Sequence, residues 1–302
     1  EKFATNLPEY SVTVVCQEHI KEMYESAPFV NGIFTFNRKK LIDDGKYQKT
    51  MAEKIRGTNA DLLINSIFSR DVVSDFFVKE SGAKVKVGFD GDLSNMTEYE
   101  MEKSKQLYDH LISITPELNE MEKNALFLRN LSIDADDYSA KVFLSEKEQL
   151  FADEFFRKNE LNPEKTIAFF AGAQYNIRYS YIYGKAMESS LREDDYTVVA
   201  LGGKNDEYIN GLNLKDFTGR IIDLTGKTTF KESAAILGKC KLAIGSETSL
   251  AHAACALNVP NVIMLGGGHF GRFMPYSELT TIVSLPLDCF NCNWACKHPE
   301  VY

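Results

Sequence analysis

Short apolar runs alternate with longer amphipathic runs along almost the whole chain. In the first half, the apolar runs have the length of strands and lie at 11–15, 32–36, 61–64 and 84–89. The stretches between them have the spacing of helices and lie at 18–25, 47–56 and 69–80. Strands that alternate with helices are typical of a parallel sheet covered by helices. The pattern therefore predicts an α/β fold.

A charged, helix-like region from 99 to about 160 separates the two halves, with one helix expected at 103–114. A last helix is expected to begin at Ser145, which forms a capping-box pattern with Glu148. Asn162-Pro163 then breaks the chain. Since 302 residues suit two ordinary domains, we expect the first at 1–160, linker included, and the second at 161–302.

The second half repeats the strand–helix rhythm more regularly. Strands are expected at 166–170, 196–201, 221–224, 242–244 and 262–265, with helices at 183–191, 206–212, 230–237 and 250–257. Glycine turns with polar residues follow the first four strands, in AGAQ, GGKND, LTGKT and GSET. Because parallel sheets bind ligands at the carboxyl ends of their strands, these turns indicate one ligand-binding edge.

The most informative of these turns is GSET, which lies in the stretch LAIGSETSLAHAACALNVPNVIMLGG. A strand ends at Gly245, and a helix of small residues begins near Leu250, where Thr248 or Ser249 can cap it. The free N–H groups and the positive dipole end of such a helix suit a phosphate, and His252 in its first turn can point to the same site. Alone, the stretch also fits an ordinary turn with a capping threonine and a buried histidine. The other three turns favour the ligand site.

This ordered set of motifs resembles glycosyltransferase family 9, the bacterial lipopolysaccharide heptosyltransferase-like enzymes. It comprises AGAQ with Arg178, then GGKND, LTGKT, ETSLAH and GGGHFGRFMPY. The resemblance implies the GT-B fold, with two Rossmann-like lobes facing a cleft. Residues 1–160 would then be the acceptor-side lobe, and 161–302 would bind the nucleotide-sugar. The N-terminal half fits more loosely. The family's presumed catalytic aspartate would precede Glu1, so we expect an incomplete N-terminal lobe and name no catalytic residue.

The resemblance also assigns roles by position. Asp206 would bind the ribose, Arg178 the diphosphate and Glu247 the donor sugar. The complete set expected at the donor site is Gly172, Gln174, Arg178, Gly202, Asp206, Gly226, Lys227, Thr228, Glu247, Thr248, Ser249, Leu250, His252, His269 and Arg272. Glutamate replaces the family's aspartate at 247, serine replaces its glycine at 249, and its Lys-Arg-Trp stretch is missing. The donor therefore need not be ADP-heptose.

The implied reaction transfers a heptose or related sugar from a nucleotide-diphospho-sugar, an ADP-sugar being favoured. The acceptor would be a glycan, a lipid-linked molecule or a protein, and the chemistry would need no metal or other cofactor. Two alternatives stay open: a GT-B-like nucleotide-sugar epimerase and a non-catalytic sugar-nucleotide-binding scaffold. A dinucleotide fingerprint at Gly266, Gly268 and Gly271 fails its context, because it follows the fifth expected strand of its domain rather than the first, and Pro275 interrupts any helix after it.

The cysteines fall into two groups. Cys16, Cys240 and Cys255 sit singly in apolar patterns, where buried thiols are expected, and a reducing compartment fits them. Near the C-terminal end, three cysteines and a histidine follow one another in DCFNCNWACKH. A structural zinc or iron ion would accept such ligands, and three reduced cysteines in a tail would give the same pattern. The expected metal ligands are Cys289, Cys292, Cys296 and His298.

The net charge of the chain limits the classes of binding partner. A formal net charge of −9 argues against a nucleic-acid binder, because phosphate contacts need clustered Lys and Arg. One local basic patch would suffice for peripheral membrane contact, so net charge leaves that question open. No apolar run approaches the roughly 20 residues that span a bilayer. We expect a cytoplasmic protein, at the inner face of the membrane if the acceptor is lipid-linked. His19 and His110 lie in helix-like stretches and are expected to be structural or exposed.

Overall fold

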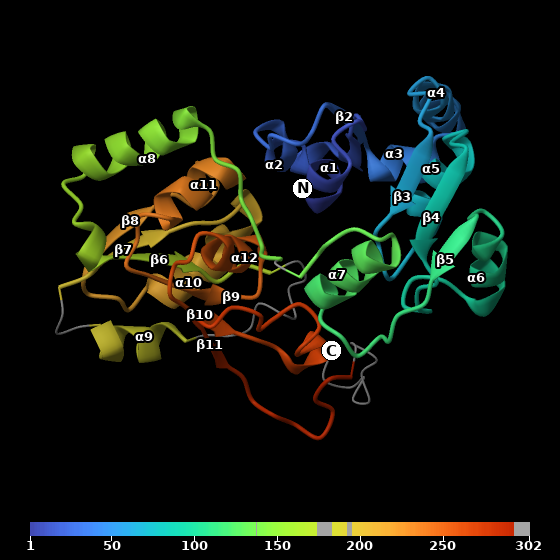
Figure 1. Cartoon of the computed structure of the whole chain (residues 1–302). Coiled ribbons are helices and arrows are strands. Elements are labelled where there is room, and N and C mark those ends of the chain that lie inside the picture. The colour runs from blue at the N-terminus through green and yellow to red at the C-terminus, as the bar shows by residue number, and fades with distance from the viewer. Residues whose placement is uncertain (137, 174–182, 192–194, 293–302) are drawn as a thin grey trace. The chain divides into compact units, whose positions relative to one another are not determined.

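A computed structural model describes residues 1–136, 138–173, 183–191 and 195–292 (Figure 1). The chain divides into two compact units, Glu1–Tyr138 and Ser139–Tyr302.

The division lies before the position expected from the sequence, which was after residue 160. The difference is helix α8 (Glu146–Lys158), which was expected to link the two domains. It packs instead along α11 (Phe230–Leu237), and its residues Ala152 and Phe156 are part of the core of the second unit. The expected capping box at Ser145 is present, with the Ser145 N–H donating to Glu148 Oε2 at 2.8 Å. The buried side chains of Ala152 and Phe156 are what attach α8 to the second unit.

The first unit contains two separate parallel sheets. A two-stranded sheet pairs β1 with β2, and a three-stranded sheet has the order β3-β4-β5. The strands are β1 (Thr13–Gln17), β2 (Gly32–Phe36), β3 (Leu62–Asn65), β4 (Val85–Phe89) and β5 (His110–Ile112). The helices are α1 (Lys2–Asn6), α2 (Glu22–Glu25), α3 (Arg38–Asp43), α4 (Gly45–Arg56), α5 (Val72–Glu80), α6 (Glu98–Lys105) and α7 (Glu120–Asn130).

Strand β5 corrects the sequence prediction of a helix over 103–114. Helix α6 starts earlier, at a capping box formed by Thr97 and Glu100, and ends at Lys105. The chain then turns, and His110–Ile112 pairs with Val87–Phe89 of β4. A strand of three residues is too short to show a period of its own, so pairing with β4 decides its conformation. His110 is exposed on this strand and not in a helix.

A buried polar network joins the elements of the three-stranded sheet. Arg70 is 0% exposed, and its guanidinium donates to the Asp90 carbonyl at 3.0 Å and lies 3.7 Å from Asp75 Oδ1. The guanidinium also lies over the ring of Tyr108, 4.7 Å from its centroid. The Tyr108 hydroxyl donates to Asp75 at 2.7 Å, and burial is the main cause that raises its pKa. This network fixes the loop after β4 to α5 and to the start of β5.

The second unit is built on one parallel sheet of six strands, with the order β11-β10-β9-β6-β7-β8. The strands are β6 (Thr166–Phe170), β7 (Thr197–Ala200), β8 (Arg220–Asp223), β9 (Leu242–Ser246), β10 (Asn261–Met264) and β11 (Thr280–Val283). Five of them were expected, and β11 was missed. Helices α8, α11 and α12 (Ser249–Ala256) cover one face, and α9 (Gly184–Leu191) and α10 (Glu207–Leu214) cover the other.

The strand order reverses at β6, which has β7 on one side and β9 on the other. In an open parallel sheet, such a reversal separates the loops at the carboxyl ends and leaves a place for a ligand. The expected α/β fold with parallel sheets covered by helices is therefore confirmed.

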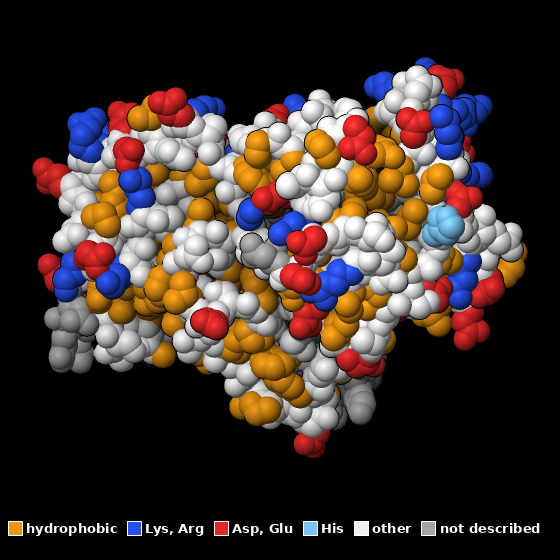
Figure 2. Space-filling view, viewed as in Figure 1, with side chains coloured by type: hydrophobic (Ala, Val, Ile, Leu, Met, Phe, Trp, Pro, Cys, Tyr) orange, Lys and Arg blue, Asp and Glu red, His pale blue; other side chains and the backbone are white. Residues whose placement is uncertain are grey.

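The described residues include no helix long and apolar enough to cross a membrane. Figure 2 shows acidic and basic side chains interspersed over the visible face, with no extended basic field there.

Candidate functional site

The turns after β6, β7 and β8 meet at the carboxyl edge of the sheet in the second unit. A Cβ atom on Gly172 would lie 2.2 Å from Asp206 Oδ1, so only glycine permits this approach. Gly202 has φ +146°, and the next N–H, of Gly203, donates to Asp206 Oδ2 at 2.8 Å. The Gly226 N–H donates to the Gly202 carbonyl at 2.9 Å. Three of the four predicted glycine turns are thus in direct contact.

Asp206 is the carboxylate at the centre of these turns. It ends the short helix η4 (Lys204–Asp206) and directly precedes α10. Its side chain is half-buried, and burial raises its pKa while the hydrogen bond from Gly203 opposes that shift. An acceptor held in this way by glycine turns is suited to bind hydroxyl groups of a ligand.

The turn between β9 and α12 adds the fourth predicted segment. Thr248 occupies the N-cap position of α12, as expected, but its side chain makes no capping hydrogen bond. The helix begins at Ser249, and Leu250 is buried and anchors its first turn. The first N–H groups of a helix have no acceptor inside the helix and attract anions. The Ser246 hydroxyl donates to the Ala171 carbonyl at 3.2 Å and so joins this turn to the turn after β6.

His252 on α12 contacts Tyr276 in the loop that follows β10. Its Nδ1 lies 3.0 Å from the Tyr276 hydroxyl, and the two rings stack at 5.7 Å and 7°. Burial lowers the pKa of His252 and raises the pKa of Tyr276. The histidine is therefore held neutral near pH 7, and it connects two of the segments that carry the family resemblance.

Lys227 and Thr228 form bonds within their own turn. The Lys227 ammonium donates to the Asp223 carbonyl at 2.7 Å, and the Thr228 hydroxyl lies 2.8 Å from the Ser233 hydroxyl. These side chains hold the turn after β8 in shape, and direct contact between them and a donor stays a prediction.

His269 and Arg272 lie in the loop after β10, at the same edge of the sheet. His269 ends the short helix η5 (Gly267–His269), and its backbone carbonyl accepts from the Arg272 N–H at 3.0 Å. Phe273 packs against both side chains, 5.2 Å from the His269 ring and 5.0 Å from the Arg272 guanidinium. Both predicted residues are half-buried against this ring.

Four predicted residues, Gln174, Arg178, Cys296 and His298, lie outside the described residues. Cys289 and Cys292 carry free, half-buried thiols, and Phe290 between them packs on Phe270 at 5.0 Å. Within the described part of the chain, no three Cys, His, Asp or Glu side chains come together as a metal site. The C-terminal metal site therefore has no structural support and stays a prediction.

Residues 49–300 match the model of glycosyltransferase family 9 (heptosyltransferase). The chain belongs to this family. Its fold is that of solved family members, such as a family 9 glycosyl transferase from Veillonella parvula (TM-score 0.79, 16% identity, 94% of this chain and 80% of that one).

Two E. coli enzymes share the fold as well. Heptosyltransferase WaaC, solved with ADP, gives a TM-score of 0.72 at 15% identity over 94% of this chain and 87% of that one. ADP-heptose LPS heptosyltransferase II gives 0.68 at 18% identity over 93% of this chain and 83% of that one. A comparison with curated proteins gives no significant match.

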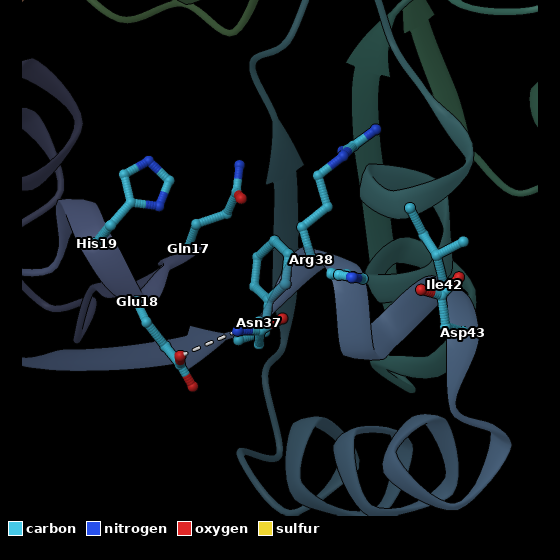
Figure 3. A pocket seen from close by; sticks show the side chains of 9 residues that line it. Gln17, Glu18, His19, Asn37, Arg38, Ile42 and Asp43 are labelled. Carbon is cyan, nitrogen blue, oxygen red and sulfur yellow. Dashed lines mark hydrogen bonds between the residues drawn. The ribbon is translucent and has the colours of Figure 1, made fainter. Parts of the chain in front are cut away.

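The first unit of this family 9 protein has a pocket of about 470 Å³ at the carboxyl ends of β1 and β2 (Figure 3). It is lined by Gln17, Glu18, His19, Phe36, Asn37, Arg38, Lys39, Ile42 and Asp43. Figure 3 shows the side chains of Gln17, His19 and Arg38 extending to the same side. Arg38 also pairs with Asp71 at 2.6 Å, and Asn37 donates to Glu18 at 3.5 Å.

This pocket was not predicted from the sequence, although His19 is exposed, as expected. His19 lies in the short helix η1 (Glu18–Ile20), directly after β1, and it lines the pocket. The polar runs QEH and NRK each follow a strand, which is the same signal that was used in the second half of the chain. Without a glycine turn in either run, the signal was not recognised.

Proposed function

We propose that this glycosyltransferase transfers a sugar, a heptose or a related one, from a nucleotide-diphospho-sugar to an acceptor hydroxyl, and that an ADP-sugar is the donor. The observation that carries the proposal is the edge of the second sheet, where two glycine turns contact Asp206, a third bonds to Gly202, and the turn before α12 bonds to Ala171. Structures of heptosyltransferase WaaC with ADP and with ADP-2-deoxy-2-fluoro heptose support this choice of donor.

The chemistry follows from the groups at this edge. The N–H groups at the start of α12 would hold the diphosphate, and the carboxylate of Asp206 would accept hydrogen bonds from the ribose. The acceptor hydroxyl gives its proton to a general base, its oxygen attacks the anomeric carbon, and the bond from that carbon to the diphosphate oxygen breaks. Negative charge then gathers on the leaving diphosphate, where fixed dipoles stabilise it without rearrangement. We propose that this step needs no metal ion.

The nucleotide preference can be measured by thermal shift of the intact protein with ADP, GDP, UDP and CDP, and the sugar contact by the shift with an ADP-sugar. We expect ADP to stabilise the protein, by about 2.7 kcal/mol when its concentration is 100 times Kd. Glu247→Ala should reduce the shift obtained with the ADP-sugar, while Glu154→Ala, an exposed substitution on α8, should leave it unchanged. The absence of a shift with all four nucleotides would overturn the proposed donor site. Transfer activity that disappears in EDTA would contradict metal-independent chemistry.

The pocket of the first unit is our proposed acceptor site. Its volume lies within the range of small-molecule sites, about 300–1,000 Å³. Its lining joins amides, an imidazole and charges of both signs to the apolar Phe36 and Ile42. Such a mixture provides donors and acceptors for sugar hydroxyls and an apolar surface for the sugar ring. A glycan, free or carried on a lipid or protein, is the acceptor that we propose.

Arg38→Ala tests this assignment. Labelled sugar is offered to glycan, lipid-linked and protein acceptors, and the acceptor that becomes labelled is used for kinetics. We expect the KM for this acceptor to rise about tenfold, with the KM for the donor unchanged, because one charged hydrogen-bond donor is lost. Lys40→Ala, next to the pocket on α3 but outside its lining, is the control and should leave both KM values unchanged. Equal effects of the two variants would place the acceptor elsewhere.

A further inference from the structure

Asn210 lies on α10, beneath the turns of the candidate donor site, and only 1% of it is exposed. Its Oδ1 accepts a hydrogen bond from the Ala171 N–H at 2.8 Å. Its Nδ2 donates to the Leu201 carbonyl at 2.9 Å and to the Thr225 hydroxyl at 2.9 Å. One buried side chain therefore joins the segments after β6, β7 and β8.

Each of these three bonds ends one residue before a glycine of the site. Ala171 precedes Gly172, Leu201 precedes Gly202, and Thr225 precedes Gly226. A single amide group therefore bonds directly to all three segments that carry the glycine turns. Through the bond from Ser246 to the Ala171 carbonyl, the turn before α12 is connected to the same group.

The chemistry of the side chain at this position is specific. A primary amide offers one acceptor oxygen and two N–H donors, and here both N–H groups and the oxygen are used. Aspartate has the same shape but lacks the donors, and glutamine is one methylene longer. The neighbouring core positions of α10 are the apolar Ile209 and Leu214. If position 210 served packing alone, an apolar residue would be enough there.

We infer that Asn210 is the positioning residue of the donor site. It holds the three glycine turns at the separation that the nucleotide requires before the nucleotide arrives. The turns then lose less conformational entropy when the nucleotide binds, so the affinity is higher. This inference rests on the proposed function of the same edge, and it assigns to Asn210 no contact with the substrate.

Asn210→Asp tests the inference, because it keeps the size and the acceptor oxygen and removes both donors. The matched control is Asn261→Asp at the start of β10, where the turns of the donor site are absent. Asn261 is also 1% exposed, and its Nδ2 donates to the Val259 carbonyl at 2.9 Å. Both variants bury a carboxylate in the same unit, so both lower its thermal stability.

The measurement is the Kd of the full chain for ADP, by calorimetry at pH 8. We expect Asn210→Asp to raise Kd about tenfold and Asn261→Asp to leave it within about twofold. An unchanged Kd in Asn210→Asp, or an equal rise in both variants, would reduce Asn210 to an ordinary structural residue. If ADP, GDP, UDP and CDP all fail to bind the wild-type protein, the proposed donor site fails and the inference fails with it.

The pH dependence of the variant separates lost hydrogen bonds from general damage. Burial raises the pKa of the introduced carboxyl, and its protonated form can again donate one hydrogen bond. The charged residues at these turns are Asp206, Glu207 and Asp223, with Lys204 beside Gly226, and all four are present in the wild type as well. The ratio of variant Kd to wild-type Kd should therefore fall from about tenfold at pH 8 to about threefold at pH 5.5. A ratio that does not fall would contradict the role given to the two donors.

Discussion

Replacing Gly172 by alanine is expected to weaken nucleotide binding about 100-fold or more. The new methyl group would lie 2.2 Å from Asp206 Oδ1 and 2.3 Å from its Cγ, far inside contact distance. Asp206 would have to rotate away from the Gly203 N–H, and the ribose would lose a charged acceptor, whose hydrogen bonds contribute about 1.5–3 kcal/mol each. The Kd for ADP of the intact variant, measured by calorimetry, gives the result.

The control for this substitution is Gly211→Ala. Gly211 lies on α10 near the same turns, but a Cβ atom there meets nothing within 4 Å. Alanine inside a helix is favoured over glycine by about 0.5–1 kcal/mol, so the control should raise stability and leave the Kd unchanged. Wild-type affinity in Gly172→Ala would show that the nucleotide does not depend on Asp206.

The second large effect concerns the buried guanidinium of the first unit. Arg70→Met is expected to destabilise that unit by about 3–5 kcal/mol, because Asp75 is left buried without its cationic partner. The unfolding of two units need not be one transition, so a global melting curve is the wrong measurement. Hydrogen exchange of the β4 amides, Val85–Phe89, reports the first unit directly, and we expect it to accelerate strongly.

Two further variants make this prediction specific. The double variant Arg70→Met with Asp75→Asn removes both charges and should recover part of the lost protection. Arg56→Met breaks an exposed ion pair with Glu80 on the same unit and should cost no more than about 1 kcal/mol. If Arg70→Met changes exchange as little as Arg56→Met does, the buried network contributes nothing to the stability of the sheet.

The second half of the chain was well predicted because its signals are local. An apolar run followed by a glycine turn identifies a strand and also puts the turn at the carboxyl edge of the sheet. On this basis Gly172, Gly202 and Gly226 were expected at one edge, where the structure has them. The missed strands β5 and β11 are three and four residues long. A three-residue strand shows no period, and β11, with the sequence TTIV and alternating exposure at the edge of its sheet, lacks the apolar run that marks the equally short β7 and β10.

The most connected residue of the candidate site gave no signal in the sequence. Asn210 lies on a helix, four residues after Asp206, where an asparagine reads as one more polar position. Its three partners are 39, 9 and 15 residues away along the chain, so only the folded chain brings them within reach. The place of α8 in the second unit was not predicted for the same reason, because its partner α11 comes much later in the chain.

The position of β6 in its sheet also determines when this edge can form during synthesis. β6 pairs with β7 soon after both strands exist, but its other neighbour is β9, and the bond between Ser246 and Ala171 spans 75 residues. Closing so long a loop is slow relative to forming local contacts. Until Ser246 has left the ribosome, one side of an apolar, fully buried strand stays open to pairing with another chain. A chain whose synthesis stops between α11 and β9 is therefore expected to aggregate through β6, even when its first unit is correctly folded.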